Sequence, residues 1–249
     1  MGRKLYSHIE RKWYIKIVSG CRNCCTYCVD RLAYTCATRS EPIEKILKQF
    51  ELGLNANHKH FHLVGRDFGS YGYYIGSTLA ELLNKTEAAY PDQTYKISIP
   101  NVSPNSLITL YPKLNPTLLS KRICEIGSHI QTGSERILKL MDRTLKLDDW
   151  KKTIQDLDKN YQKIRIITSI IVGFPGETEE DFKKTTNLLS NLVFDKVEVY
   201  KYNERPNLPS LKLKGLVPEA IKIRRWKKVK NLTRVNTLRK RIKRNRILY

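Results

Sequence analysis

The sequence lacks long hydrophobic runs, and this absence excludes membrane-spanning proteins of the helical type. No stretch of eighteen consecutive apolar residues occurs in the 249 residues, so no segment is predicted to cross a bilayer. Residues 1–17 are polar and basic, without the apolar segment of a secretory signal. We therefore expect a cytoplasmic protein with no membrane partner, in which a disulfide framework is not expected.

Acidic residues are missing from the end of the chain. Between Ala220 and Tyr249 there are thirteen Lys and Arg and no Asp or Glu, within a chain of net charge +22. Such a stretch attracts phosphate backbones or other polyanions, although a solvated helix face in a basic protein is the plainer alternative. The candidate substrate contacts in this stretch are Arg239, Lys240 and Arg241.

The most informative feature present is a group of three cysteines, Cys21, Cys25 and Cys28. They have the spacing C-x-x-x-C-x-x-C and directly follow a short apolar strand. Three thiolates on one loop can hold three irons of a four-iron cluster, which leaves the fourth iron open to a small molecule. A zinc site would need a second cysteine pair, and none follows.

The other three cysteines, Cys24, Cys36 and Cys124, fall outside this spacing. We expect each of them to be a buried or tolerated thiol. Cys24 is a possible substitute ligand if the loop slips by one residue.

Strand and helix signals alternate along the chain, which predicts parallel strands with helices outside them. Six units fall short of the eight that close a full barrel, so we expect an α/β fold with a partial (β/α)6 barrel. Pro218 opens a long basic helix, so residues 1–217 are predicted as the core and residues 218–249 as a helix packed on it at its start. The strands are predicted at 14–18, 61–64, 95–99, 123–130, 164–172 and 196–200, and the helix seam at Trp226, Val229, Leu232, Val235, Leu238 and Ile242.

The distinctive motifs follow the predicted strands, where the loops of parallel α/β folds build their sites. The runs G-C-R-N-C-C-T-Y-C, L-V-G-R-D, I-Q-T-G-S-E-R and I-V-G-F-P-G-E-T occur in this order. Over residues 12–235 the chain resembles the radical S-adenosylmethionine (SAM) domain of methylthiotransferases, which modify tRNA adenosines or a ribosomal-protein aspartate.

That resemblance implies a [4Fe-4S] cluster on the three cysteines, SAM on the open iron, and cleavage of SAM to a 5′-deoxyadenosyl radical. It also implies an electron donor such as flavodoxin or ferredoxin, and RNA, above all tRNA, as the substrate.

The resemblance also assigns roles to single residues. Tyr27 lies beside the adenine, Arg143 reaches a carboxylate, and Arg205 faces the substrate. The plainer alternatives are a turn at Gly65, a helix cap at Ser134, an exposed side chain at Arg143 and a rigid turn beginning at Phe174. The expected cofactor-binding residues are Tyr27, Gly65, Arg66, Asp67, Gln131, Ser134, Arg143, Val172, Gly173 and Phe174.

The chain also departs from that family. Arg66, His129 and Ser169 replace residues typical of it. The family's N-terminal domain with three further cysteines and its C-terminal RNA-binding barrel have no counterpart in the sequence, so sulfur insertion by this chain alone is not expected. A radical SAM enzyme that matures a small peptide is a close alternative. A non-catalytic or split partner that binds RNA or a second polypeptide is another.

Overall fold

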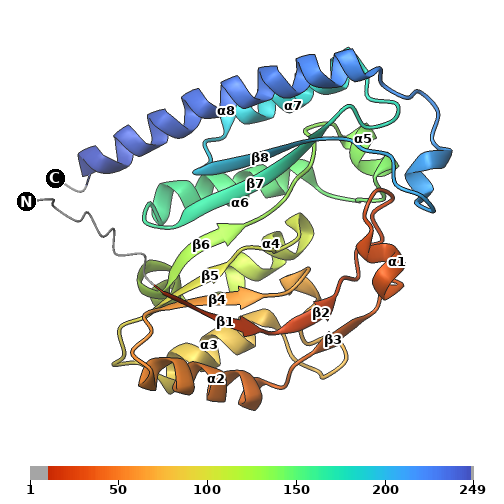
Figure 1. Cartoon of the computed structure of the whole chain (residues 1–249). Helices are drawn as coiled ribbons and strands as arrows, with labels where there is room; N and C mark the ends of the chain where they lie inside the picture. The colour runs from red at the N-terminus through yellow and green to blue at the C-terminus, as the bar shows by residue number, and fades with distance from the viewer. Residues whose placement is uncertain (1–10, 248–249) are drawn as a thin grey trace, which may run out of the picture.

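The computed structural model describes residues 11–247, and its centre is a curved parallel sheet of six strands (Figure 1). The strand order is β1-β4-β5-β6-β7-β8, so the main strands follow one another in space as they do in the chain. β1 and β8 form the two edges of the sheet, which makes it the open partial barrel that the alternation predicts. The strands are β1 Lys12–Lys16, β4 His60–Val64, β5 Lys96–Ile99, β6 Ile123–Gly127, β7 Arg165–Val172 and β8 Lys196–Lys201.

Helices cover the outer face of this sheet because alternate strand residues are apolar there. In β4, Phe61 and Leu63 are fully buried in the core, whereas His60 and His62 point to the inner face. The helices are α2 Ile43–Asn55, α3 Leu79–Ala89, α4 Pro104–Leu110, α5 Glu135–Leu140, α6 Leu147–Asn160, α7 Glu179–Asn191 and α8 Glu219–Ile247, with short turns η1 Phe68–Ser70, η2 Tyr111–Lys113, η3 Leu118–Arg122 and η4 Pro209–Lys212.

A small subdomain follows β1 that the sequence pattern did not predict. Strands β2 Val18–Gly20 and β3 Thr38–Ser40 pair antiparallel, and the short helix α1 Asp30–Tyr34 lies between them in the chain. Strands of three residues and a helix with no buried residue carry no hydrophobic period, so nothing in the sequence marks them. The hairpin lies at the base of the cysteine loop.

Helix α8 packs along α7 and β8, but only part of its predicted seam is correct. Val229 is buried, and the Trp226 indole donates to the Val199 carbonyl at 2.9 Å. Val235, Leu238 and Ile242 are instead about half exposed. The buried stripe is mostly polar, and Arg225, Asn236 and Lys240 bond to groups on the core. The stripe comprises Lys222, Arg225, Thr233, Asn236 and Lys240.

The prediction that Lys240 contacts the substrate does not agree with its position in the structure. Its side chain is 7% exposed, and its amine lies 2.7 Å from Asp158 and 3.1 Å from Asp195. Two carboxylates already neutralise this charge, so Lys240 fixes α8 to the core and is not free for a phosphate. The side chains of Arg239 and Arg241 lie outside the described part of the structure.

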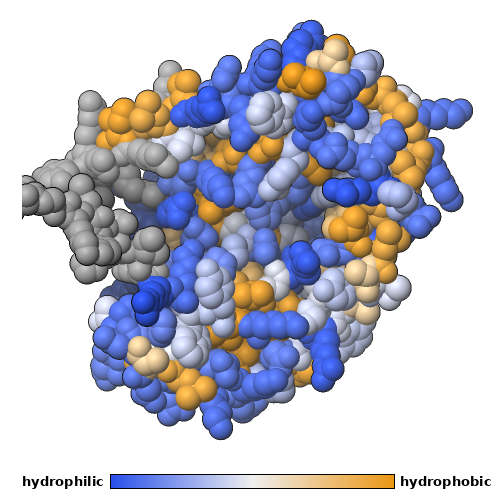
Figure 2. Space-filling view, in the orientation of Figure 1, coloured by the Kyte–Doolittle hydropathy of each residue, from blue (hydrophilic) through white to orange (hydrophobic). Residues whose placement is uncertain are grey.

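The face of the molecule in Figure 2 is largely hydrophilic and is hollowed between its β8 side and its β1 side. Within residues 11–247, none of the helices combines the length and apolarity needed to cross a membrane.

Candidate active site

One cavity of about 800 Å³ lies at the carboxyl ends of the strands, where the post-strand loops meet. Loops that follow β1, β4, β5, β6 and β8 and the end of β7 all contribute lining residues. The residues that line it are Cys21, Asn23, Cys25, Tyr27, Cys28, Val29, Asp30, Arg66, Asp67, Asn101, Val102, Ser103, His129, Gln131, Arg143, Ser169, Ile171, Glu198, Tyr200, Lys201, Tyr202, Asn203 and Arg205.

The three spaced cysteines all line this cavity, as their pattern predicts. Burial raises the pKa of the Cys21 thiol to about 11, and the nearby Asp67 carboxylate adds to the effect. Burial also raises the pKa of Cys28. A metal bound here must therefore displace protons from the thiols, as thiolate ligation requires in general.

The cysteine loop is fixed by contacts to distant parts of the chain. The Thr26 amide donates to the Met141 carbonyl at 3.1 Å, at the end of α5. The Ser210 amide, in η4, donates to the Thr26 carbonyl at 3.1 Å. These two bonds tie the centre of the loop to both α5 and η4.

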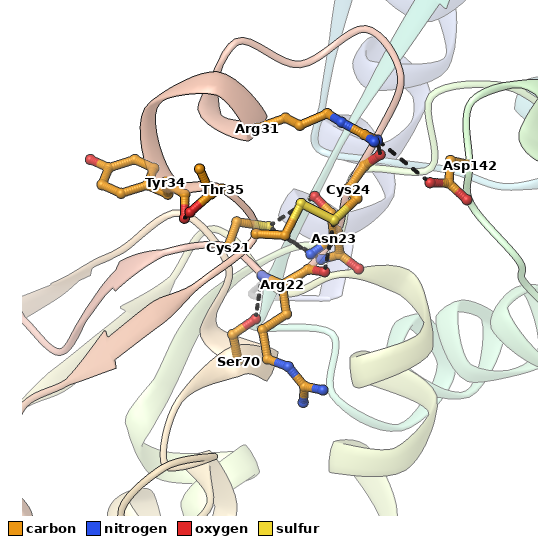
Figure 3. The surroundings of a disulfide bond; sticks show 10 residues. Cys21, Arg22, Asn23, Cys24, Arg31, Tyr34, Thr35, Ser70 and Asp142 are labelled. Carbon is orange, nitrogen blue, oxygen red and sulfur yellow. Dashed lines mark hydrogen bonds and ion pairs between the residues drawn. A yellow bond between two sulfur atoms is a disulfide. The ribbon is translucent and has the colours of Figure 1, made fainter. Parts of the chain in front are cut away.

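A disulfide joins Cys24, within the loop, to Cys36 (Figure 3), which corrects the expectation that both are unpaired thiols. Cys24 does not line the cavity, so it is withdrawn as a substitute ligand in this structure. The Arg31 guanidinium bonds the Cys24 carbonyl and lies 3.7 Å from Asp142. Cys124 is a free thiol on β6, remote in the chain from the loop.

Asp67 supports the cysteine loop and has no acceptor position left for a cofactor. One carboxylate oxygen accepts from the amides of Gly69 and Ser103 at 3.1 and 3.0 Å. The other accepts from the Asn23 side chain and the Ser70 hydroxyl, both at 2.8 Å. Four donors saturate a carboxylate, so the predicted cofactor contact becomes a positioning role.

Gly65 faces a neighbouring groove and does not line the cysteine cavity. A Cβ there would lie 2.6 Å from a Val18 methyl and 2.8 Å from the Phe68 ring, so close packing requires the glycine. Arg66 lines both the groove and the cavity, and its Nε lies 3.5 Å from an Asp30 oxygen.

Tyr27 and Arg143 form a pair on the cavity wall. An Arg143 nitrogen donates to the Tyr27 hydroxyl at 3.0 Å, and a second donates to the His129 carbonyl at 2.9 Å. Burial raises the pKa of Tyr27 above its usual range, so the phenol stays neutral. The Phe174 ring meets the Tyr27 ring edge-on at 6.2 Å and supports it from the core side.

Gln131 and Ser134, which belong to one motif, have different roles. Gln131 lines the cavity and has a positive φ of 73°. Ser134 is fully buried, caps α5, and donates to Asp181 at 2.6 Å. Ser134 is therefore a helix cap, the alternative to a cofactor contact named in the sequence analysis, and it does not line the cavity.

Like Ser134, the predicted cofactor-binding residues Val172, Gly173 and Phe174 do not line the cavity. The Gly173 amide donates to Glu177 at 2.6 Å, and the same carboxylate oxygen accepts from Arg225 of α8 at 2.7 Å. The backbone predicted to border the adenine is thus committed to the protein, and Ile171 and Tyr202 line the cavity in its place.

Arg205 is exposed and lines the cavity, and its contact with the substrate stays a prediction. Sequence reasoning missed several lining residues that follow strands directly, and that position was the signal that could have found them. They are Asn23, Asn101, Ser103 and His129. Four further lining residues that were not predicted, Ser169, Ile171, Glu198 and Tyr200, lie within β7 and β8.

Comparison with known proteins identifies a family whose members have the same cysteine-bearing domain. Residues 15–189 match the family model described as the radical SAM superfamily. A threonylcarbamoyladenosine tRNA methylthiotransferase of Thermotoga maritima is 35% identical over 89% of this chain and 52% of its own length. A tRNA-2-methylthio-N(6)-dimethylallyladenosine synthase of Acetivibrio thermocellus is 34% identical over 89% of this chain and 46% of its own.

Solved structures show the same fold. The radical SAM methyltransferase TsrM from Kitasatospora setae aligns with a TM-score of 0.63 at 14% identity, over 79% of this chain and 38% of that one. Methylornithine synthase aligns with a TM-score of 0.53, also at 14% identity, over 89% of this chain and 61% of that one. The chain spans about half the length of the curated relatives it matches. With its family model covering well over half of the residues, the chain belongs to the radical SAM superfamily.

Proposed function

We propose that this chain is the catalytic domain of a radical SAM enzyme of the methylthiotransferase type that modifies RNA, with tRNA as the substrate. The observation that carries the proposal is the convergence of Cys21, Cys25 and Cys28 on one cavity lined by five other strand ends. A loop that only needed buried thiols would not need this convergence.

The donor set fits a four-iron cluster better than a single metal ion. Within residues 11–247, no three His, Cys, Asp or Glu side chains lie close enough to bind one ion. A mononuclear zinc site needs its ligands gathered around one centre, whereas a cluster takes each thiolate on a separate iron. A cluster held by Cys21, Cys25 and Cys28 and reduced by an external donor would supply the electron for reductive cleavage of SAM.

The protein's own groups would hold SAM beside the cysteines. Arg143 offers a guanidinium to the methionyl carboxylate, and the Gln131 amide lies in the same wall. Tyr27 lies between Cys25 and Cys28 in the chain, its hydroxyl accepts from Arg143, and its ring packs edge-on against Phe174. These side chains orient the cofactor, and the buried wall behind them excludes water.

RNA as the substrate is supported by two independent observations. The relatives at 34–35% identity bear names that specify tRNA modification. The net charge of +22 favours a polyanionic partner, whose binding would weaken with added salt.

The test is product analysis with anaerobically reconstituted protein, dithionite and SAM. We expect 5′-deoxyadenosine and methionine to form slowly, and faster when tRNA is added. Cys25→Ala should form neither product. A protein that carries four irons but gives no 5′-deoxyadenosine would favour the non-catalytic alternative, and stimulation by small peptides instead of tRNA would favour peptide maturation.

A further inference from the structure

A second groove adjoins the cysteine cavity on the inner face of β1 and β4. Its volume is about 600 Å³, and it shares the lining residues Arg66 and Asn101 with the cavity. The groove therefore opens beside the place where the proposed function positions the reacting base. Nothing in the proposed roles of the cysteines or of the SAM contacts uses it.

Aromatic rings form part of this groove. Tyr14, Tyr34 and His62 all line it. The Tyr14 side chain belongs to an edge strand and is 62% exposed, and its ring meets the His62 ring at 5.2 Å. Its chain neighbour Ile15 is buried in the core, so the alternation of β1 turns Tyr14 to the inner face. Exposed rings in such a groove are platforms on which unpaired bases stack.

The groove is also cationic. Lys16 and Arg66 line it, and no Asp or Glu does among the described residues. Lys16 is exposed, and the Glu41 carboxylate that it influences electrostatically does not line the groove. A base platform next to two cationic side chains matches a nucleotide, which presents one flat ring system and one phosphate.

We propose that this groove binds the nucleotide next to the one being modified, with its base against Tyr14 and its phosphate against Lys16 and Arg66. The inference rests on RNA being the substrate, as proposed above. It explains why an edge strand of the barrel leaves a tyrosine and a lysine exposed on its inner face, beside the reaction cavity.

A second exposed aromatic pair provides a matched control. Tyr73 and Tyr74 are 56% and 65% exposed, lie 4.8 Å apart, and line neither the groove nor the cavity. Arg22 lies 3.3 Å from the centre of the Tyr73 ring. Like the groove, this pair combines exposed tyrosine rings with a nearby arginine. It therefore tests whether RNA binding depends on the position of the rings or only on their chemistry.

The experiment uses a labelled single-stranded RNA with one 2-aminopurine, whose fluorescence reports stacking, and anisotropy for affinity. We expect Tyr14→Ala to weaken binding about tenfold and to reduce the 2-aminopurine quenching, because stacking on one ring contributes on this scale. Tyr14→Phe should bind within about twofold of the wild type. Lys16→Gln should lower the slope of log affinity against log salt by about 0.7.

The controls separate the inference from the proposed function. Tyr73→Ala with Tyr74→Ala should leave affinity and quenching unchanged, and far-ultraviolet circular dichroism should confirm that the exposed Tyr14 can be replaced without unfolding. Wild-type protein that binds no RNA would overturn the RNA substrate. Wild-type protein that binds RNA, with Tyr14→Ala equally tight and equally quenched, would overturn the groove alone, and a loss confined to the Tyr73 and Tyr74 variant would place the platform there.

Discussion

The loops that follow β1 and β7 reach the same end of the barrel, yet they are built in opposite ways. The first presents Cys21, Cys25 and Cys28 to the cavity as free thiols. The second, residues 173–178, lines no part of the cavity. Its polar groups bond to the protein, as in the pair of Glu177 with Arg225, whose side chains are 0% and 5% exposed.

The difference separates two uses of a motif. In the loop after β1, the motif residues are the reactive groups. In the loop after β7, the motif residues G-F-P-G-E-T form a support that holds Phe174 behind Tyr27 and joins α8 to the barrel. Replacing any of the three cavity-lining cysteines of the first loop should therefore abolish the cofactor and spare the fold, and mutations in the second loop should do the reverse.

The largest effect should come from the cysteine loop. Cys25→Ala should reduce the iron bound after anaerobic reconstitution from about four atoms per chain to near zero, because one of only three ligands is lost. Cys124→Ala, a free thiol elsewhere on the sheet, should retain the full iron content. Iron analysis with a protein assay measures both, and full iron in Cys25→Ala would break the ligand assignment.

Arg225→Ala should lower the free energy of unfolding by about 3–5 kcal/mol, because it leaves the Glu177 carboxylate buried without its cation. Arg224 is the matched control, since its side chain is 61% exposed and pairs with Glu179 at 3.0 Å. Arg224→Ala should cost less than about 1 kcal/mol. Urea unfolding distinguishes the two, and equal losses would show that the buried pair does not hold α8.

Cys24→Ser should lower the free energy of unfolding by about 3 kcal/mol, because the disulfide to Cys36 closes a short loop of the chain. Under denaturing, non-reducing conditions a thiol assay should find four free thiols in the wild type and five in the variant. Iron binding should persist, since Cys24 does not line the cavity. Six free thiols in the wild type would contradict the disulfide.

Asp181→Asn should cost about 2 kcal/mol, because Asp181 accepts from Ser134, Arg136 and Thr178. Burial alone would raise the pKa of this carboxyl, but those hydrogen bonds hold it well below its usual range. A depressed pKa stabilises the fold at pH values above the unfolded pKa of about 4, and this contribution is lost as the pH falls below it. The difference in Tm from the wild type should be constant from pH 5 to 8 and shrink below pH 4, and a difference that grows on acidification would oppose this sign.

The sequence predicted the elements whose pattern of apolar residues is strong enough to determine the local structure. The strand predicted at 164–172 appears as Arg165–Val172, because a run of β-branched residues buried on both sides has few alternatives. The stripe of α8 could not be predicted in the same way. Arg225 and Lys240 are buried there because carboxylates or carbonyls on the core receive them, and such partners lie far away in the chain.

The candidate site shows the same limit. Cysteine spacing along one loop predicted the thiols that line the cavity, because the chemistry requires that spacing. For Ser134 and Gly173, the sequence motif alone did not distinguish a residue that lines the cavity from one that supports the cavity-lining residues. That difference depends on Asp181 and Glu177, which meet them only in the folded chain.

Electron paramagnetic resonance of the reduced protein, with and without SAM, tests the central claim most directly. Three cysteine ligands leave one iron open, so we expect a reduced [4Fe-4S] signal whose g values shift when SAM is added. The shift should be absent in Cys25→Ala because no cluster forms there. A fully reduced four-iron signal that SAM leaves unchanged would contradict the account.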